Sequence, residues 1–355
     1  MSLKYLKAVD FRCLATAEIE ADSHYNLIYG RNASGKTSVL EAIAYLGRGK
    51  SFRGAATQDL VRHGSTEFIL QGEISSEART ARVGVRNGRG GLAIKVDGEK
   101  AASAAALAEA LPLQVVDPDV HSLVAGGPEG RRRYLDWIAF HVEHTYLERW
   151  RRFRRALKQR NAALRDGAPA NVLAGWDREF VDTARFIHES RERVVALATD
   201  VFEETGGGLL DASPGLEYRH GWNADMTLEE ALLAGVSRDR ELGSTQSGPH
   251  RGDLRLVLDE RQARKLVSRG QQKLLSCALI LTATELVQSE TGRPLLLLLD
   301  DPAAELDEIS LQRLMARVIG LGCQVIATAL VPDKHLFPDP PALFHVEQGE
   351  LQRAG

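Results

Sequence analysis

Apolar and polar residues alternate through much of the first 120 residues of the chain. Residues 68–70, 81–85 and 92–96 show this period of two, which is typical of half-buried antiparallel strands. The dipeptides Asn87-Gly88 and Asp97-Gly98 are turn signals of the kind that close such strands. This part of the chain is predicted to combine an antiparallel sheet with helices.

The pattern changes to a helical spacing of three and four between residues 121 and about 205. A Gly-Gly-Gly triplet at 206–208 is expected to break this helical region. One later run is too apolar to alternate, which is typical of a strand buried on both faces. The elements predicted after the triplet are a strand at 254–258, a helix at 271–288, the buried strand at 294–299, a helix at 311–319 and a core strand at 324–329.

Composition places the chain among ordinary globular proteins, with 355 residues of which 44% are hydrophobic and 26% charged. Cys13, Cys277 and Cys323 are far apart and lack metal-ligand spacing, which favours free thiols in a reducing compartment. The first residues lack the apolar core of a signal peptide, and the longest apolar run is too short to cross a bilayer. We therefore expect a cytoplasmic protein with no membrane partner.

Residues 30–37 read G-x-x-x-x-G-K-T, between an apolar run at 25–29 and a helical pattern at 39–46. Glycine at both ends lets the backbone N–H groups wrap around a phosphate, aided by the positive end of the following helix. Lys36 would bridge the β- and γ-phosphates, and the Thr37 hydroxyl would ligate Mg²⁺. The predicted binding residues for ATP are Gly30, Arg31, Asn32, Ala33, Ser34, Gly35, Lys36, Thr37 and Ser38.

Two carboxylates, Asp300 and Asp301, directly follow the apolar run at 294–299. In phosphate-loop enzymes the first acid at such a strand end holds Mg²⁺. The second could act as general base toward the attacking water. We therefore predict Asp300 as a metal ligand and Asp301, with Lys36, as catalytic.

The segment 267–273, Val-Ser-Arg-Gly-Gln-Gln-Lys, resembles the signature motif of ABC-type ATPases, and 304–307 resembles their D-loop. The resemblance implies an ABC-type ATPase head, which is an α/β phosphate-loop NTPase fold with an antiparallel β subdomain. In such heads Ser268, Gly270 and Gln271 would contact the nucleotide of a partner subunit, so ATP would drive homodimerisation. The alternative is that Ser268 only caps a helix.

The wide separation of the nucleotide motifs predicts a discontinuous head formed by residues 1–120 and 235–355, with a helical insertion lobe at 121–234. The switch histidine of ABC-type heads has no evident counterpart, Thr328 being the substitute, so hydrolysis should be slow. Gln114 is the candidate for the Q-loop glutamine. Arg12 is either a phosphate contact or a plain surface arginine.

Net charge is −3, yet residues 131–165 are rich in arginine and lysine. Arg151, Arg154, Arg155 and Lys158 are spaced at three and four, which places them on one helix face. This face is either simply solvated or a contact for DNA phosphates. No signature of base readout is visible, so binding would be backbone-driven and salt-dependent.

Further motifs lie along the whole length, at residues 6–12, 30–38, 50–53, 127–128, 131–133, 135–137, 247–253 and 268–273. Together they resemble the bacterial RecF family of recombination mediators, which is related to SMC-type heads. The family implies a DNA-dependent ATPase that binds duplex DNA and single-/double-strand junctions near gaps, acts with RecR and RecO, and helps load RecA onto single-stranded DNA. His250 then has a structural or interface role in preference to metal ligation.

Three rival functions remain open on the sequence. A transporter ATPase would normally carry a switch histidine and no long insertion, and an SMC-like tether would need sustained heptads. A scaffold that binds ATP without hydrolysing it would differ from the ATPase of the main hypothesis only in releasing no phosphate. Arg269 in the signature and Ala303-Ala304 before the D-loop depart from the usual ABC pattern, so the rate of turnover is left open.

Overall fold

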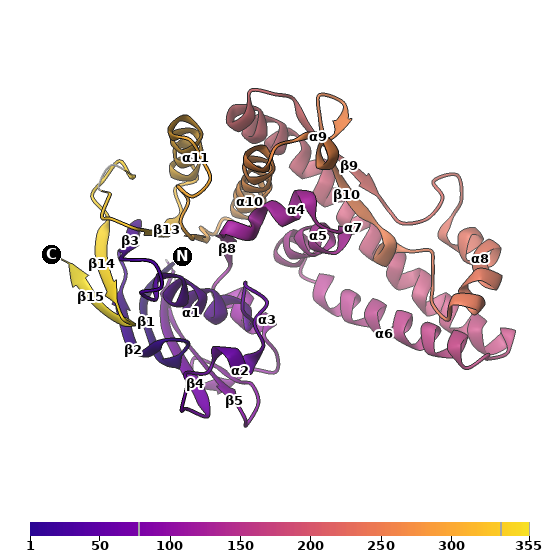
Figure 1. Cartoon of the computed structure of the whole chain (residues 1–355). Coiled ribbons are helices and arrows are strands. Elements are labelled where there is room, and N and C mark those ends of the chain that lie inside the picture. Colours follow the sequence, from indigo (N-terminus) through magenta and orange to yellow (C-terminus); the bar gives the residue numbers. More distant parts are fainter. Residues whose placement is uncertain (77–78, 334–335, 355) are drawn as a thin grey trace. The chain divides into compact units, whose positions relative to one another are not determined.

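The computed structural model describes residues 1–76, 79–333 and 336–354, which form two compact units (Figure 1). The head unit comprises residues 1–120 and those from 292 onward, and the lobe unit comprises residues 121–291. Each is described by itself below. The first boundary coincides with the expected end of the first head segment.

A six-stranded, mostly parallel sheet forms the centre of the head unit, in the order β15-β14-β3-β13-β12-β8. Every residue of β8 and β12 is buried, as the continuous apolar runs require. Only β15 is antiparallel, through its hairpin with β14. The strands are β3 (Tyr25–Tyr29), β8 (Leu113–Val116), β12 (Leu296–Leu299), β13 (Gln324–Ala329), β14 (Ala342–Glu347) and β15 (Glu350–Ala354).

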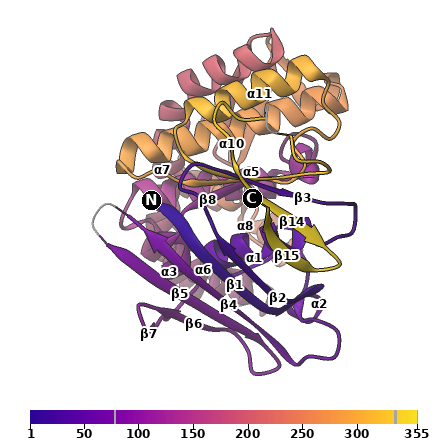
Figure 2. The same cartoon turned by 90° about the vertical axis from the view of Figure 1, so that its left-hand side faces the viewer.

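A second, antiparallel sheet follows the order β2-β1-β4-β5-β6-β7 (Figure 2). Asp97 and Gly98 both have positive φ and form the two-residue turn between β6 and β7. Asn87 and Gly88 instead lie at the end of β5. The strands are β1 (Ser2–Phe11), β2 (Leu14–Glu20), β4 (Glu67–Ser75), β5 (Thr80–Gly88), β6 (Ala93–Val96) and β7 (Glu99–Lys100).

Helix α1 (Lys36–Arg48) contacts strands of both sheets, and its fully buried residues Leu40 and Ile43 share one core with Phe68 and Ile326. The loop between β3 and α1 is short. The packing of α1 therefore holds its first residue next to the carboxyl end of β3. The other helices of the head unit are α2 (Thr57–Leu60), α3 (Ala105–Ala110) and α11 (Glu308–Gly320), and the 3-10 turn η1 (Pro118–His121) leads out of it.

The lobe unit is mostly helical, with a small sheet of order β11-β10-β9. The long helices α6 and α7 pack side by side, and α10 packs on α7 (Figure 1). The helices are α4 (Ser122–Ala125), α5 (Pro128–Val142), α6 (Tyr146–Arg165), α7 (Ala170–Leu210), α8 (Leu228–Leu242), α9 (Ala263–Leu266) and α10 (Arg269–Thr291). The remaining elements are β9 (Pro214–Arg219), the 3-10 turn η2 (Pro249–Arg251), β10 (Asp253–Leu258) and β11 (Arg261–Gln262).

The second boundary of the insertion differs from the expected one. Residues 235–291 were assigned to the head by sequence, but the compact lobe unit continues to Thr291. The reason is α10, whose buried residues pack against α7 and α5. A helix that is apolar on nearly all sides gives no sequence signal of which neighbour it covers.

The glycine triplet at 206–208 does not break the helical region, so that expectation was wrong. Helix α7 continues through it to Leu210. A Cβ added at Gly206 would lie 2.7 Å from Pro214 Cγ and 3.7 Å from Ala278 Cβ. The glycine therefore permits close packing against β9 and α10, which offsets its poor helix propensity.

Candidate nucleotide-binding site

The phosphate loop leaves β3 at Tyr29 and enters α1 at Lys36. Gly30 and Gly35 have φ of 156° and 116°, and Ala33 is also left-handed at 61°. A Cβ at Gly30 would lie 2.3 Å from the Val346 carbonyl oxygen, so no side chain fits there. Arg31, Asn32 and Ala33 are exposed. The loop thus has the closed backbone turn and open outer side that a phosphate requires.

Lys36 is directed back over this loop. Its Nζ donates to the carbonyl oxygens of Gly30 at 2.6 Å and Arg31 at 2.9 Å. Burial lowers the pKa of Lys36 from its usual value, while Asp301 and Asp300 act in the opposite direction. The ammonium is held where a phosphate oxygen could replace either carbonyl.

Asp300 follows β12 and lies beside the phosphate loop. Its Oδ1 accepts hydrogen bonds from Thr37 Oγ1 at 3.0 Å and Thr328 Oγ1 at 2.8 Å. Burial raises the pKa of Asp300, and the hydrogen bonds from the two threonines oppose this rise. The sheet therefore joins the two predicted metal ligands, which are 263 positions apart in the chain.

Thr328, the substitute for the switch histidine, is fully buried at the end of β13. Its hydroxyl oxygen also accepts from the Asp301 N–H at 2.8 Å. Asp301 has a positive φ of 50°, which turns the chain sharply after the strand. Thr328 therefore orients both acids, and its hydroxyl is occupied by them.

The oxygen atoms of Thr37 and Asp300 fit Mg²⁺, which favours one or two protein oxygens supplemented by water and phosphate oxygens. Across the described ranges, no group of three or more His, Cys, Asp and Glu side chains is arranged to hold a metal. A metal here would thus depend on a bound phosphate for part of its coordination. When bound, it would neutralise charge on that phosphate.

Arg12 is held within the head unit. Its Nε and Nη2 donate to the two carboxylate oxygens of the buried Glu41 at 2.8 and 3.0 Å. Nη1 donates to the Asp59 carbonyl oxygen at 3.0 Å. A phosphate contact by Arg12 would require the guanidinium to leave this bidentate pair.

Gln114 lies inside β8 and is buried, with its Oε1 accepting from Arg48 Nη2 at 3.2 Å. The residue that reaches the end of this strand is Asp117, which sequence reasoning missed. Since Val116 pairs with Leu299, Asp117 and Asp300 leave neighbouring strands side by side. Burial, and then Asp119 and Asp300, raise the pKa of Asp117 to about 6. Its sequence signal was the same as that of Asp300: an apolar run that ends in an acid.

Ser268, Gly270 and Gln271 lie in the lobe unit, at the start of α10. Ser268 Oγ accepts from the Gln271 N–H at 3.3 Å, and Gln271 Oε1 accepts from the Ser268 N–H at 3.0 Å. This is a reciprocal capping arrangement on an exposed helix end. The segment therefore caps the start of α10, and Ser268 is open to solvent.

The arginines of α6 divide into two sets. On the side toward α7 and α8, Arg152 pairs with Glu179, and the fully buried Arg160 pairs with Asp177 and Asp239, each at 2.6 Å. The four predicted DNA contacts, Arg151, Arg154, Arg155 and Lys158, are all exposed. Among the described residues, Arg154, Arg155 and Lys158 form no ion pair.

His250 is half-buried in the lobe unit, where its Nε2 lies 2.9 Å from the Thr245 carbonyl oxygen. Burial lowers the pKa of His250 to about 4, so it is neutral at pH 7. The same loop is held by Arg191, whose Nη1 donates to the Pro249 carbonyl oxygen at 2.7 Å. These contacts agree with a structural role.

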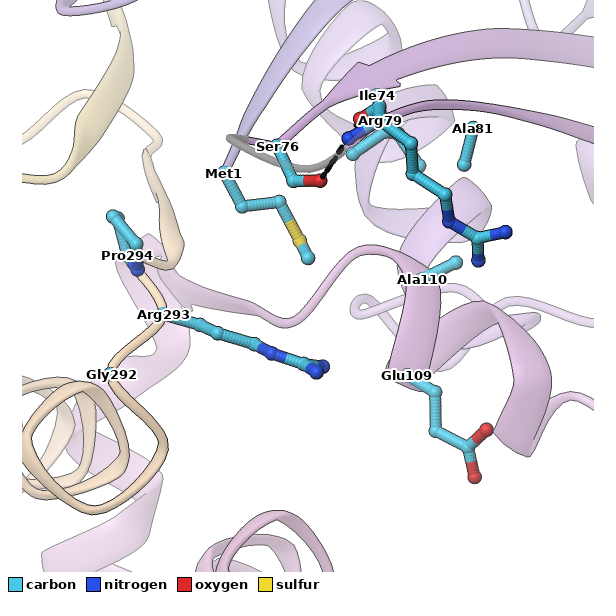
Figure 3. A pocket seen from close by; sticks show the side chains of 10 residues that line it. All are labelled: Met1, Ile74, Ser76, Arg79, Ala81, Glu109, Ala110, Gly292, Arg293 and Pro294. Atoms are coloured by element: carbon cyan, nitrogen blue, oxygen red, sulfur yellow. Dashed lines mark hydrogen bonds between the residues drawn. The ribbon is translucent and has the colours of Figure 1, made fainter.

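A cavity of about 320 Å³ also lies in the head unit, lined by Met1, Arg79, Glu109, Arg293 and their neighbours (Figure 3). Ala110 and Pro294, which also line it, precede β8 and β12. The cavity is therefore at the amino ends of these parallel strands, whereas Asp117 and Asp300 follow their carboxyl ends. It is separate from the phosphate loop.

Comparison with known proteins agrees with this geometry. The family model described as "RecF/RecN/SMC N terminal domain" matches residues 2–342. The DNA replication and repair protein RecF of Pseudomonas putida (strain W619) is 39% identical over 362 residues, covering 99% of this chain and 98% of the relative. The chain belongs to the RecF family. A second member, from Shewanella pealeana, is 36% identical with 99% of each chain covered.

Solved structures confirm the fold. The recombination mediator protein RecF-ATP in the RecFOR pathway superimposes with a TM-score of 0.91 at 24% identity, covering 100% of this chain and 98% of that one. An Smc head bound to the C-winged helix domain of ScpA gives 0.62 at 16% identity, with 100% and 97% covered. The predicted ABC-type head with an antiparallel β subdomain and a helical lobe is therefore confirmed. Within the described residues, no helix combines the length and apolar character needed to span a bilayer.

Proposed function

We propose that this chain is an ATP-dependent DNA-binding protein of DNA replication and recombinational repair, acting in the RecFOR pathway. ATP with Mg²⁺ would drive homodimerisation on duplex DNA near single-strand gaps, and slow DNA-stimulated hydrolysis would reset the protein. With RecO and RecR it would help load RecA onto single-stranded DNA. Membership of the RecF family and the RecF names of its relatives support this assignment.

The observation that carries the nucleotide part of the proposal is the hydrogen bond between Thr37 and Asp300. It brings the end of the phosphate loop against the acid that follows a parallel strand, and a bound metal ion would contact both oxygens. Lys36 Nζ donates to the Gly30 carbonyl oxygen of the same loop. A triphosphate seated there would meet a cation, backbone N–H groups and an oxygen-lined metal position together.

Hydrolysis would use Asp301 as the general base toward water. Its backbone is fixed through Thr328 and lies next to Asp300. Thr328, near the end of β13, is the substitute for the switch histidine, and its hydroxyl is already bonded to the two acids. Slow turnover would follow, because a threonine hydroxyl held in this way assists proton transfer less than an imidazole does.

The signature segment would act in trans. Ser268 is exposed at the positive end of α10, where it can meet an anion carried by a partner subunit. Replacing Ser268 with Arg keeps the phosphate loop intact but adds bulk and charge at this contact. The Ser268→Arg variant should bind an ATP analogue as the wild type does, yet remain monomeric in sedimentation with that analogue. Analogue-driven dimerisation of this variant would refute the in-trans role.

The exposed face of α6 would contact DNA phosphates. The Arg154→Gln/Arg155→Gln variant should weaken binding to a duplex and lower the slope of log affinity against log salt by about 2. The Lys95→Gln/Lys100→Gln variant is a matched control, since it removes two exposed cations from the antiparallel sheet. Equal losses of duplex affinity in both variants would show that DNA binding depends on overall charge and not on α6.

The test of the whole proposal is sedimentation of the purified protein with no nucleotide, with ADP and with a non-hydrolysable ATP analogue, each with and without duplex DNA. We expect a dimer only with the analogue, and DNA in the dimer fraction. A monomer in every condition would refute the proposed dimerisation and favour a nucleotide-binding scaffold. Phosphate release with and without DNA separates that scaffold from a slow ATPase.

A further inference from the structure

The turn of the C-terminal hairpin lies directly behind the phosphate loop. Strand β14 pairs in parallel with β3, with His345 opposite Tyr29, the last residue before the loop. After two more residues of β14, the turn to β15 reaches Gly349, whose N–H donates to the Ser34 carbonyl oxygen at 2.8 Å. The hairpin and the loop are thus joined by a backbone hydrogen bond.

Backbone and methyl contacts fill the rest of this junction. A Cβ at Gly30 would lie 2.3 Å from the Val346 carbonyl oxygen. A Cβ at Gly35 would lie 3.4 Å from Val346 Cγ1 and 3.5 Å from Gly349 Cα. Both fixed glycines of the loop therefore face the hairpin, and Val346 is 1% exposed between them.

The turn between β1 and β2 closes the junction from the other side. Gly349 has φ of +82°, and a Cβ there would lie 2.5 Å from the Cys13 carbonyl oxygen. Cys13 Sγ in turn is 3.5 Å from Ser38 Oγ in the first turn of α1. Gly349 is therefore wedged between Cys13 and Ser34, in a conformation and a space that only glycine fits.

A phosphate loop needs such support because its own bonds are few. Its N–H groups that receive the ligand must stay turned outward, so few remain to fix the loop by bonding to the protein. Those of Gly30 and Ser34 do so, to the carbonyl oxygens of Ala329 and Arg31. We propose that Gly349 and Val346 are positioning residues that hold the phosphate loop in its nucleotide-binding conformation. This inference rests on the proposed nucleotide binding, and it makes the hairpin 342–354 a part of the nucleotide site.

The primary test compares Gly349→Ala with Gly322→Ala. Gly322 is also left-handed, at φ +61°, and lies in the head unit, but a Cβ there meets nothing within 4 Å. Both variants introduce backbone strain, and only Gly349→Ala pushes on the loop. In titrations with a fluorescent ATP analogue, we expect Gly349→Ala to weaken affinity by about ten-fold relative to Gly322→Ala, the effect of one lost hydrogen bond at the upper end of its range. Equal affinities would overturn the proposal.

Hydrogen exchange of the nucleotide-free proteins provides a readout that does not require binding. The hydrogen-bonded amides of Gly30 and Ser34 should exchange faster in Gly349→Ala than in Gly322→Ala or wild type. Unchanged exchange at these two amides would overturn the bracing role, whatever the affinities. If the wild type bound no nucleotide while exchange still rose, the proposed function would fail and the bracing would stand.

A second variant covers the case in which Gly349→Ala does not fold. Val346→Ala removes the methyl groups that face Gly35 and leaves the backbone bond from Gly349 in place. Val325→Ala is its control, because Val325 is equally buried in the same sheet but at the amino end of β13. Faster loop exchange and weaker analogue binding in Val346→Ala alone would support the proposal, and parallel changes in both variants would overturn it.

Discussion

In the head unit, Lys36 and Asp300 are buried and each makes specific hydrogen bonds to the loop or to its neighbours. On α6 of the lobe unit, Arg154, Arg155 and Lys158 are exposed and stand in a row of similar charges. In the first arrangement each residue is indispensable, because no other residue can make its contacts. The second spreads a task over several cations, so any single one contributes little.

The same contrast runs through α6 itself. Arg160 is fully buried and pairs with two aspartates, whereas Arg155, five positions earlier, is exposed. One residue type in one helix therefore serves two purposes. Burial and the presence of a carboxylate partner decide which, and neither can be seen in the spacing of the arginines alone.

Removing Arg160 should have the largest effect. Arg160→Ala leaves Asp239 buried without its partner and should lower the free energy of unfolding of the lobe by about 3–5 kcal/mol. Chemical denaturation followed by fluorescence measures this. Arg155→Ala is the control from the same helix, with an expected change below about 0.5 kcal/mol. Similar losses in the two variants would contradict the division of α6 into two faces.

Removing Lys36 should abolish useful nucleotide binding. Lys36→Ala deletes a charge-assisted contact to phosphate, so affinity for an ATP analogue should fall on the order of 100-fold. Analogue-induced dimerisation should disappear with it. Lys158→Ala provides the matched lysine control, and its nucleotide affinity should equal that of the wild type. Dimerisation of Lys36→Ala at analogue concentrations that suffice for the wild type would refute the assignment of the loop.

Replacing Asp117 should change the free energy of unfolding in a way that depends on pH. Its pKa in the folded protein is raised to about 6, above the ordinary value of 3.8. The folded state thus binds its proton more tightly, and this contribution to stability is present below pH 3.8 and is lost as pH rises through 6. Asp117→Asn should therefore raise the unfolding free energy of the nucleotide-free protein by about 1–3 kcal/mol at pH 8.

At pH 4 the gain from Asp117→Asn should nearly vanish. The check is a pair of denaturation curves at the two pH values. A gain of the same size at both would show that the change acts through packing or hydrogen bonding and not through the charge of Asp117.

A single exposed arginine should have the smallest effect. Arg155→Ala should weaken duplex binding by less than about three-fold at physiological salt and reduce the salt slope by about 1. Filter binding across a series of salt concentrations measures both quantities. A loss of 100-fold or more would mean that Arg155 occupies a unique position, as Lys36 does, and the comparison between the two regions would fail.

The phosphate loop and Asp300 could be predicted because their signals are local: a contiguous motif, and an apolar run that ends in acids. The meeting of the first and last segments of the chain in one head then follows from the need to bring the two motifs together. The same logic applied to the run before Asp117 would have found that residue. The other polar residue of that run, Gln114, lies inside the strand and does not reach its end.

Other features depend on contacts between distant segments. The pairing of Arg12 with Glu41 and the sharing of Thr328 by two acids require the folded head. The end of the lobe unit at Thr291 depends on which helices α10 covers. The glycine triplet predicts a helix break because helix propensity is a local quantity, whereas the close approach of Gly206 to Pro214 depends on a distant segment.

The order of the parallel sheet also has a consequence for the timing of synthesis. Strand β3 emerges early, but its two sheet neighbours, β13 and β14, come from the end of the chain, and the hydrogen bond from Asn26 to Val325 spans 299 positions. At about 5–20 residues per second, a ribosome needs roughly 15–60 s to cover that interval. During this time the first segment of the head has unpaired strand edges. We therefore expect the nascent protein to depend on chaperones until its last strands are released. Removal of even a short segment at the C-terminus should be far more harmful than the number of residues lost suggests.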